Sequence, residues 1–168
     1  MIIGFDAKRI VRNNTGLGSY SRNLVNDLSS VLDSGTEMRL YAPDEGNEAL
    51  RRQVRETAFM KFVYPDSCNF RLTRDLWRIK GIVDDLKRDK VDLFHGLTGE
   101  LPMGIKKAGI KSVVTIHDLI FMHHPEYYNW LDTKIYVWKF HQTCKEADRI
   151  IAISECTKRD IIRFGGVD

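Results

Sequence analysis

Three polar stretches of this chain have residue types and spacings that could bind a phosphate or a hydroxyl-rich substrate. The stretch Thr15-Gly16-Leu17-Gly18-Ser19-Tyr20 follows an apolar segment and precedes a helix-like run. Glycines let a backbone approach an anion, and the N–H groups that begin a helix favour negative charge. The pair His117-Asp118 offers an imidazole whose proton affinity a carboxylate could tune, for contact with a hydroxyl or a phosphate. The pair His95-Gly96 is the third stretch.

The glycine spacing differs from two common nucleotide-binding motifs. Ser21 stands where the dinucleotide fingerprint G-x-G-x-x-G has its third glycine, and no Gly-Lys-Ser/Thr follows, as a P-loop requires. The pattern therefore predicts a phosphate site of another kind. The alternative is a tight strand-to-helix connection that binds no ligand.

Each polar candidate also has a structural interpretation. His117-Asp118 could be a capping pair that organises its loop. A histidine at the position of His95 is more often structural, with its ring hydrogen-bonded by backbone groups. Glu100 could reach a cleft from the loop after His95, although solvent exposure is the simpler expectation. His123-His124 together with His117 raise the question of a metal site. Adjacent residues usually point apart, and no carboxylate pair has ligand spacing, so we expect no metal.

The elements that must position these residues alternate along the chain. Short apolar runs, typical of strands buried on both faces, predict strands at 2–7, 37–42, 58–64, 91–95, 111–116 and 149–153. Helices are expected at 20–32, 48–57, 72–88 and 126–147, with a last helix that Ser154 caps and Gly165-Gly166 ends. The fold class is therefore α/β: a doubly wound, mostly parallel, Rossmann-like sheet with helices on both faces.

The three polar stretches all follow predicted strands. In open parallel sheets ligands bind at the carboxyl ends of the strands. We therefore expect the glycine stretch, His95 and His117-Asp118 to meet at one edge. The 168 residues are expected to form one domain, and because the chain stops where another strand would come, a continuation is expected.

Composition narrows the class of protein. The formal net charge is +3, from 26 basic and 23 acidic residues, which is too small an excess to predict nucleic-acid binding. The basic clusters Lys106-Lys107 and 71–78 are expected to be solvated. The thiols of Cys68, Cys144 and Cys156 are expected to be reduced. Neither an apolar run of about 20 residues nor a signal-peptide pattern is seen, so we expect a cytoplasmic protein.

The aromatic residues of the region 127–140 are interpreted as core and helix packing rather than as a stacking platform. They are Tyr127, Tyr128, Trp130, Tyr136, Trp138 and Phe140.

Four stretches in register resemble the N-terminal domain of the family 4 retaining glycosyltransferases, the mannosyltransferase-like group built from two Rossmann-like domains (the GT-B fold). They are 4–7 with 15–24, 92–96 with 101–102, 114–119, and 147–154 with 158–161. The resemblance implies that this half recognises the acceptor. A C-terminal domain, absent from this chain, would hold most of the nucleotide-sugar donor through paired glutamates.

The resemblance also implies roles for individual residues. Gly16, Leu17 and Gly18 would lie beside the donor diphosphate, with backbone N–H groups as hydrogen-bond donors. His117 would face the transferred sugar or the acceptor, and Asp118 would support its loop. His95 and Glu100 are further candidates for acceptor contact. The family generally needs no catalytic metal or other cofactor, and because many members glycosylate lipid carriers, a peripheral membrane contact at the cytoplasmic face stays open.

The leading hypothesis is therefore a hexosyltransferase domain. It would move a hexose, with mannose favoured, from a nucleotide sugar to a glycan or lipid-linked acceptor, as in cell-surface polysaccharide synthesis. Isolated, it would fold but be nearly inactive, because half of the transition-state contacts would be missing. The alternative is a non-catalytic Rossmann-like module that binds a phosphorylated or sugar ligand. A metal-dependent hydrolase using His117, Asp118 and His123-His124 is the weakest reading.

Overall fold

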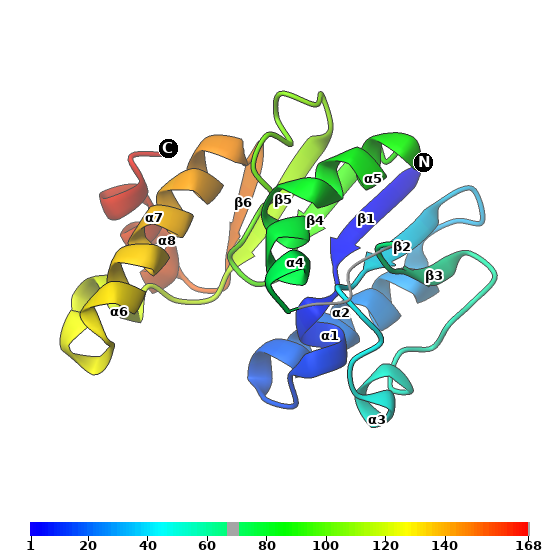
Figure 1. The fold of residues 1–168 in the computed structure, drawn as a ribbon, viewed down its shortest axis with the longest axis horizontal. Coiled ribbons are helices and arrows are strands. Elements are labelled where there is room, and N and C mark those ends of the chain that lie inside the picture. The colour runs from blue at the N-terminus through cyan, green and yellow to red at the C-terminus, as the bar shows by residue number, and fades with distance from the viewer. Residues whose placement is uncertain (67–70, 168) are drawn as a thin grey trace.

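A six-stranded parallel sheet forms the centre of the molecule (Figure 1). The computed structural model describes residues 1–66 and 71–167. The strands lie in the order β3-β2-β1-β4-β5-β6, so the chain winds outward in both directions from the β1–β4 pair. They are β1 (Ile2–Asp6), β2 (Glu37–Tyr41), β3 (Met60–Val63), β4 (Leu93–Gly96), β5 (Lys111–Ile116) and β6 (Arg149–Ala152). All six predicted strands are confirmed, and the sheet is parallel throughout.

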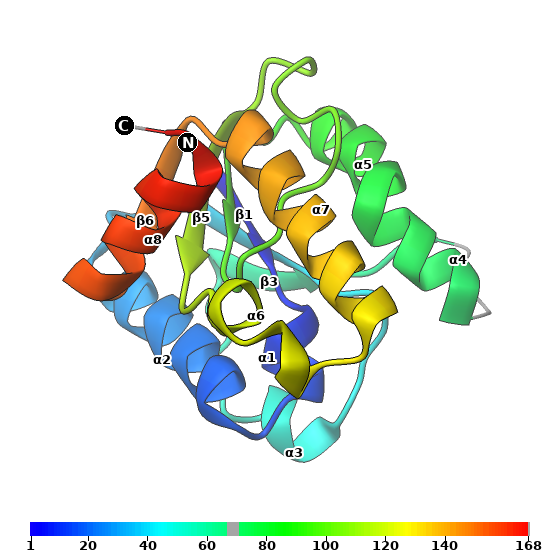
Figure 2. The ribbon, with the colours of Figure 1, turned by 90° about the vertical axis from the view of Figure 1, so that its left-hand side faces the viewer.

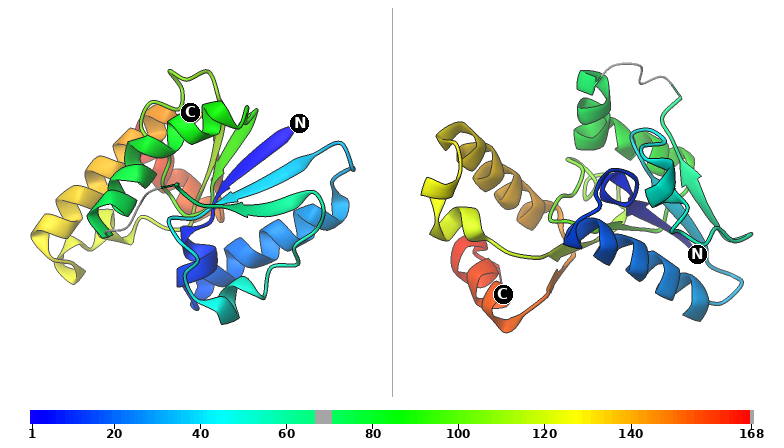
Figure 3. Two further views of the ribbon diagram at one scale, coloured as in Figure 1. Left: turned by 45° about the vertical axis from the view of Figure 1, so that its right-hand side comes forward. Right: turned by 90° about the horizontal axis from the view of Figure 1, so that it is seen from below.

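Helices cover both faces of this sheet, as the doubly wound pattern predicts (Figures 2 and 3). One layer holds α1 (Lys8–Arg12), α2 (Gly16–Val31) and α3 (Glu48–Arg51). The other holds a continuous run of α4 (Arg71–Leu76), the π-helical turn η1 (Trp77–Gly81) and α5 (Ile82–Arg88), and beside it α7 (Trp130–Glu146). Between β5 and α7 lie α6 (Ile120–His123) and the 3₁₀ turn η2 (Pro125–Tyr127), and α8 (Glu155–Gly165) follows β6.

Alternate strand residues supply two separate cores. Phe5 and Leu40 face one layer with Val25 of α2, whereas Phe94 and Val114 face the other, where α5 and α7 pack. This alternation is the two-residue period of a strand, and it explains why the strands read as continuous apolar runs. The carboxyl ends of β1, β4 and β5 therefore meet at one edge, between the two helical layers.

Several predicted helix boundaries were wrong. The helix expected at 20–32 begins at Gly16, and the unpredicted α1 separates it from β1. The helix expected at 48–57 ends at Arg51, and the one expected at 126–147 begins only at Trp130, where the side chain of Asn129 caps it. The last helix agrees with its prediction: the Ser154 hydroxyl accepts from the Thr157 N–H, and Gly166 ends it with φ of 62°.

The glycine stretch is the first turn of α2 rather than a loop, because Asn13 caps the helix from outside. Its Oδ1 accepts hydrogen bonds from the backbone N–H groups of Thr15 and Gly18, each at 3.0 Å. The buried Arg22 guanidinium then donates to the carbonyls of Ile10 and Asn13. These bonds fix α1 against α2, and they supply partners for N–H groups at the start of α2 and for carbonyls at the end of α1.

The two glycines of this turn have different structural reasons. A Cβ at Gly18 would lie 1.8 Å from the Asn13 carbonyl oxygen, so only glycine fits there. A Cβ at Gly16 would meet nothing within 4 Å. Packing therefore explains Gly18 and leaves Gly16 without a structural requirement.

The aromatic series at 127–140 was wrongly assigned to the core. Only Phe140 is buried, and the exposed members are Tyr127, Trp130, Tyr136 and Trp138. Val31, near the end of α2, is also exposed. Cys144 and Cys156 are free thiols, as predicted, and burial raises the pKa of Cys144 to about 11. Cys68 lies outside the described residues.

Gly18→Ala is expected to lower the free energy of unfolding by about 2–3 kcal/mol, because a methyl group must displace the Asn13 carbonyl. Gly16→Ala should leave it unchanged or raise it by up to about 1 kcal/mol, since alanine is the better helix former. Urea denaturation of the two variants measures the difference. Equal losses at both positions would contradict the packing described for Gly18.

Candidate functional site

A cleft of about 230 Å³ opens at the carboxyl edge of the sheet, between the starts of α1 and α2 and the inner side of α7. We name it the strand-end cleft. It brings together four of the predicted site residues and two basic ones that the sequence did not indicate: Leu17, Glu100, His117, Asp118, Arg9 and Lys139. Gly16, Gly18 and His95 are not among its lining residues.

His117 is fixed by contacts from three other elements. Its Nε2 lies 3.0 Å from the carbonyl oxygen of Leu97, and its ring meets the edge of Tyr20 with centroids 4.7 Å apart. Its own carbonyl oxygen accepts from the Thr157 hydroxyl of α8 at 3.1 Å. Because a carbonyl only accepts, Nε2 must carry the hydrogen. In the neutral ring Nδ1 is then an acceptor, and no described residue bonds it.

Asp118 is exposed beside this ring. Its Oδ1 accepts from the backbone N–H of Ile120 at 3.3 Å, at the start of α6. The contact organises the loop after β5, as the capping interpretation expected, while the side chain still lines the cleft.

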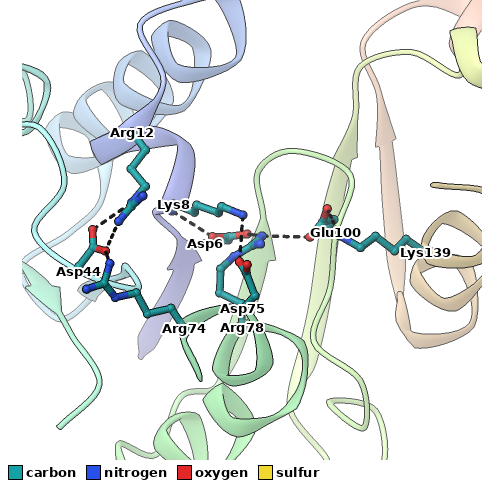
Figure 4. Close-up of polar contacts among 9 residues, drawn as sticks. All are labelled: Asp6, Lys8, Arg12, Asp44, Arg74, Asp75, Arg78, Glu100 and Lys139. Carbon is teal, nitrogen blue, oxygen red and sulfur yellow. Dashed lines mark hydrogen bonds and ion pairs between the residues drawn. The ribbon is translucent and has the colours of Figure 1, made fainter. Parts of the chain in front are cut away.

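A chain of four charges runs beneath the strand-end cleft (Figure 4). The Arg78 Nη2 lies 2.7 Å from Asp6 Oδ2 at the end of β1 and 3.1 Å from Glu100 Oε2 in the β4–β5 loop. The Lys139 Nζ of α7 then lies 3.0 Å from Glu100 Oε1. Arg78 was predicted to be solvated with the rest of 71–78, and this was wrong: its side chain is 10% exposed.

Arg78 lies in the π-helical turn η1. A cavity of about 30 Å³ adjoins it, lined also by Asp6 and Glu100. Insertion of a π turn re-aims side chains within a helix, and such turns are frequent at functional sites.

The charge chain holds Glu100 ionised. Burial alone raises the pKa of Glu100, but the positive charges of Arg78 and Lys139 outweigh it and lower the pKa to about 2. Burial opposes the charge of Arg78 too, and the carboxylates of Asp6 and Glu100 reverse this, so its pKa rises. Glu100 thus stays a pure hydrogen-bond acceptor at neutral pH. The expectation of a solvated Glu100 was wrong.

A second ionic cluster lies farther along the same edge (Figure 4). Asp44, after β2, forms ion pairs with Arg12 of α1 and with Arg74 of α4. The Arg74 Nη1 lies 2.7 Å from Asp44 Oδ2. Lys8 lies 3.5 Å from Asp75, and its backbone N–H donates to Asp6. The cluster ties α1 and α4 together across the end of the sheet.

The first turn of α2 offers two unpaired donors beside the cleft. Among the described residues, the backbone N–H groups of Gly16 and Leu17 have no partner, as expected for the start of a helix. The N–H of Gly18 is already bound by Asn13. The donors predicted for a phosphate therefore reduce to two.

His95 lies behind the cleft rather than in it. It is 7% exposed, and its Nε2 lies 2.9 Å from the Thr115 hydroxyl on β5. Burial lowers the pKa of His95 to about 4, so the ring is neutral near neutral pH. The same Thr115 hydroxyl lies 3.2 Å from the hydroxyl of Tyr20 on α2.

The histidines considered for a metal site each have another partner. His123 Nε2 lies 2.9 Å from Asp160 Oδ1, and His124 Nδ1 lies 2.9 Å from Glu126 Oε1. Across residues 1–66 and 71–167, no group of three or more His, Cys, Asp or Glu side chains is arranged to hold a metal ion.

Residues 14–168 match the sequence model of Glycosyltransferase Family 4. The chain belongs to glycosyltransferase family 4. The family implies a nucleotide-sugar donor and an acceptor, and the parallel six-stranded Rossmann-like sheet is consistent with one half of a GT-B enzyme. The search of curated proteins found no match. Within the described part of this family 4 domain, no helix is both long and apolar enough to cross a bilayer.

Sequence reasoning missed the residues that set the electrostatics of this family 4 domain. Arg9 comes three residues after β1, and that position at the carboxyl edge was the available signal. Lys139 stands one helical turn before the buried Thr143, so the two side chains share one side of α7, and this helical spacing was the available signal. No comparable signal marks Arg78, which lies in the π-helical turn and pairs with Asp6.

Arg78→Met is expected to lower the free energy of unfolding by about 3–5 kcal/mol near neutral pH, because it leaves two carboxylates without their shared cation. Denaturation of the variant measures the loss. The ion-pair contribution of Glu100 is complete above its unfolded pKa and disappears as the pH falls through about 2, so the gap to the wild type should narrow in acid.

The matched control is Arg52→Met, which removes an exposed pair with Glu48. It should change the free energy of unfolding by less than about 0.5 kcal/mol. A loss at Arg78 no greater than this would show that the charge chain does not hold the edge together.

His95 should make the domain less stable in mild acid. Its pKa is about 4 folded and 6.5 as a free side chain, so the unfolded chain binds the extra proton between these values. The contribution of the neutral His95 ring to the free energy of unfolding is complete above the pKa of the free side chain. It should fall by about 2 kcal/mol between about pH 7 and about pH 5. Denaturation at several pH values measures the slope. His95→Asn should remove that part of the slope, and an unchanged slope would disprove the assignment.

Proposed function

We propose that this domain binds the acceptor in a hexosyl transfer from a nucleotide sugar, with mannose the favoured sugar and a glycan or lipid-linked acceptor. The observation that carries the proposal is the strand-end cleft, where His117 and the ionised Glu100 lie at the edge where a parallel sheet binds its ligand. The family supplies the reaction class, and the polar lining of this cleft supports the proposal that it binds the acceptor.

Hydroxyl groups of an acceptor match the cleft chemistry. Glu100 accepts hydrogen bonds, and Nδ1 of His117 is an acceptor held in a fixed orientation by the Leu97 carbonyl. Arg9 adds a positive charge to the lining, which suits an acceptor with an anionic group. A polyol can therefore be oriented so that one hydroxyl oxygen is held for attack on the anomeric carbon.

The donor contact would be smaller on this side. The N–H groups of Gly16 and Leu17, with the positive end of α2, can stabilise diphosphate oxygens as the bond to the sugar breaks. Most of the donor would be held by a second Rossmann-like half outside these 168 residues. No metal or other cofactor is assigned a role, and Asp118 keeps the His117 loop in place.

The test is release of the nucleoside diphosphate from a panel of nucleotide sugars by the full natural polypeptide. His117→Ala should lower kcat by about 100-fold, the scale of losing one oriented polar contact. His117→Gln, which can still donate to Leu97 and accept from a hydroxyl, should recover part of that loss. The 1–168 chain alone should be nearly inactive.

Two outcomes would overturn this proposal. Turnover by residues 1–168 at the rate of the full polypeptide would show that no second half is needed. No turnover with any nucleotide sugar, together with binding of a sugar or phosphorylated ligand that His117→Ala abolishes, would favour the non-catalytic binding module.

A further inference from the structure

A second cavity, of about 210 Å³, opens at the carboxyl edge of the sheet, beside the ends of β1 and β2. Lys8 and Arg12 of α1 line it together with Pro43 after β2 and with Arg74 and Asp75 of α4. We name this cavity the basic pocket. It shares no lining residue with the strand-end cleft, which lies beside the ends of β4 and β5. The edge therefore carries two separate openings.

The lining of the basic pocket has an excess of positive charge. Three of its five residues are cations, and Asp75 is the one acid among them. Asp44 pairs with both arginines but does not line the cavity. Figure 4 shows Lys8 and Arg12 reaching from α1 towards the two α4 side chains. Because the compensating carboxylate lies behind the arginines, the cavity itself is electropositive.

Two of these cations have hydrogen-bond donors to spare. The Lys8 Nζ lies 3.5 Å from Asp75 Oδ1, longer than an ordinary hydrogen bond, and no other described residue pairs with it. Arg12 donates to Asp44 through Nε and Nη2, and its Nη1 has no partner among the described residues. An ammonium and a guanidinium each carry more N–H groups than these contacts use.

The surroundings of Lys8 lack negative charge. Its side chain is half-buried, and burial together with the positive charge of Arg78 lowers the pKa of Lys8. Nearby carboxylates oppose this shift without cancelling it. An anion beside the ammonium would favour its charged form. Binding of an anion would therefore relieve a local excess of positive charge.

A phosphate group matches this pocket in charge, geometry and size. Its several acceptor oxygens can be shared between an ammonium and a planar guanidinium, both of which bind phosphate well. The cavity has room for such a group, since a water molecule needs only about 10–15 Å³ of this volume. Its place at the carboxyl ends of parallel strands is where sheets of this kind bind ligands.

We propose that the basic pocket binds a phosphate group of a small ligand. Lys8 would supply ammonium donors and Arg12 its Nη1, while Arg74 adds positive charge from α4. Two sources offer the same chemistry: a phosphate on the molecule that occupies the strand-end cleft, and a separate phosphorylated ligand. The pocket is distinct from the donor site expected at 16–18, because it includes none of those residues.

The experiment is a calorimetric titration of the purified protein with inorganic phosphate. Low salt limits screening, and at about pH 8 the phosphate carries close to two negative charges. Lys8→Gln and Arg12→Gln should each weaken the affinity at least about tenfold, because each removes a charge-assisted donor. Lys8→Gln breaks no hydrogen bond of that side chain within the described residues, so the variant should fold, and circular dichroism checks this.

Arg9→Gln is the matched control. Arg9 is the next residue of the same helix and the change removes the same charge, but its side chain lines the strand-end cleft. This variant should bind inorganic phosphate as the wild type does. Equal weakening by Arg9→Gln and Lys8→Gln would show a general effect of net charge and overturn the proposal. Undetectable phosphate binding, or wild-type affinity in both pocket variants, would overturn it too.

Mannose 6-phosphate distinguishes the two sources of the phosphate. If one molecule spans the pocket and the strand-end cleft, it should bind more tightly than inorganic phosphate, and His117→Ala should remove the gain. If the ligand is separate, the two probes should bind alike and His117→Ala should change neither. Phosphate binding is read without any sugar donor, so its failure would leave the transferase proposal intact, and the reverse also holds.

Discussion

The buried guanidinium of Arg78 is the interaction on which the carboxyl edge of this domain depends. It forms ion pairs with Asp6 at the end of β1 and with Glu100 in the β4–β5 loop. Glu100 also forms an ion pair with Lys139 of α7. Buried carboxylates without a cation would repel each other and be costly to desolvate. The edge can therefore carry several acidic side chains close to its cleft because Arg78, in the π-helical turn η1, lies between Asp6 and Glu100.

Uncharged contacts at the same edge fix the orientation of His117, a candidate site residue. His117 is bound by backbone on one side and by Tyr20 on the other, and its loop is tied to α8 through Thr157. A polar group that is oriented before the substrate arrives loses little on binding, so its position favours selectivity among hydroxyl groups.

The sequence was sufficient to predict the strands of the sheet. It was insufficient to predict the ion pairs at the carboxyl edge. Apolar runs place all six strands, and their carboxyl ends bring Leu17 and His117 to one cleft. Helix starts were less predictable, because the cap of α2 comes from Asn13, outside the glycine pattern. Arg78 could not have been placed, since a π turn has no recognisable sequence pattern. The exposed Trp130 and Trp138 were misjudged because apolarity alone does not tell a buried side chain from an exposed one.

The hydroxyl of Thr115 has a consequence for how this site treats ligands of different size. It contacts both His95 of β4 and Tyr20 of α2, and Tyr20 in turn packs on His117. The first turns of α2 and the imidazole are thereby connected through side chains of β4 and β5, and the sheet sets the distance between them. A ligand that spans both must have the matching length, so the site would select molecules by their dimensions.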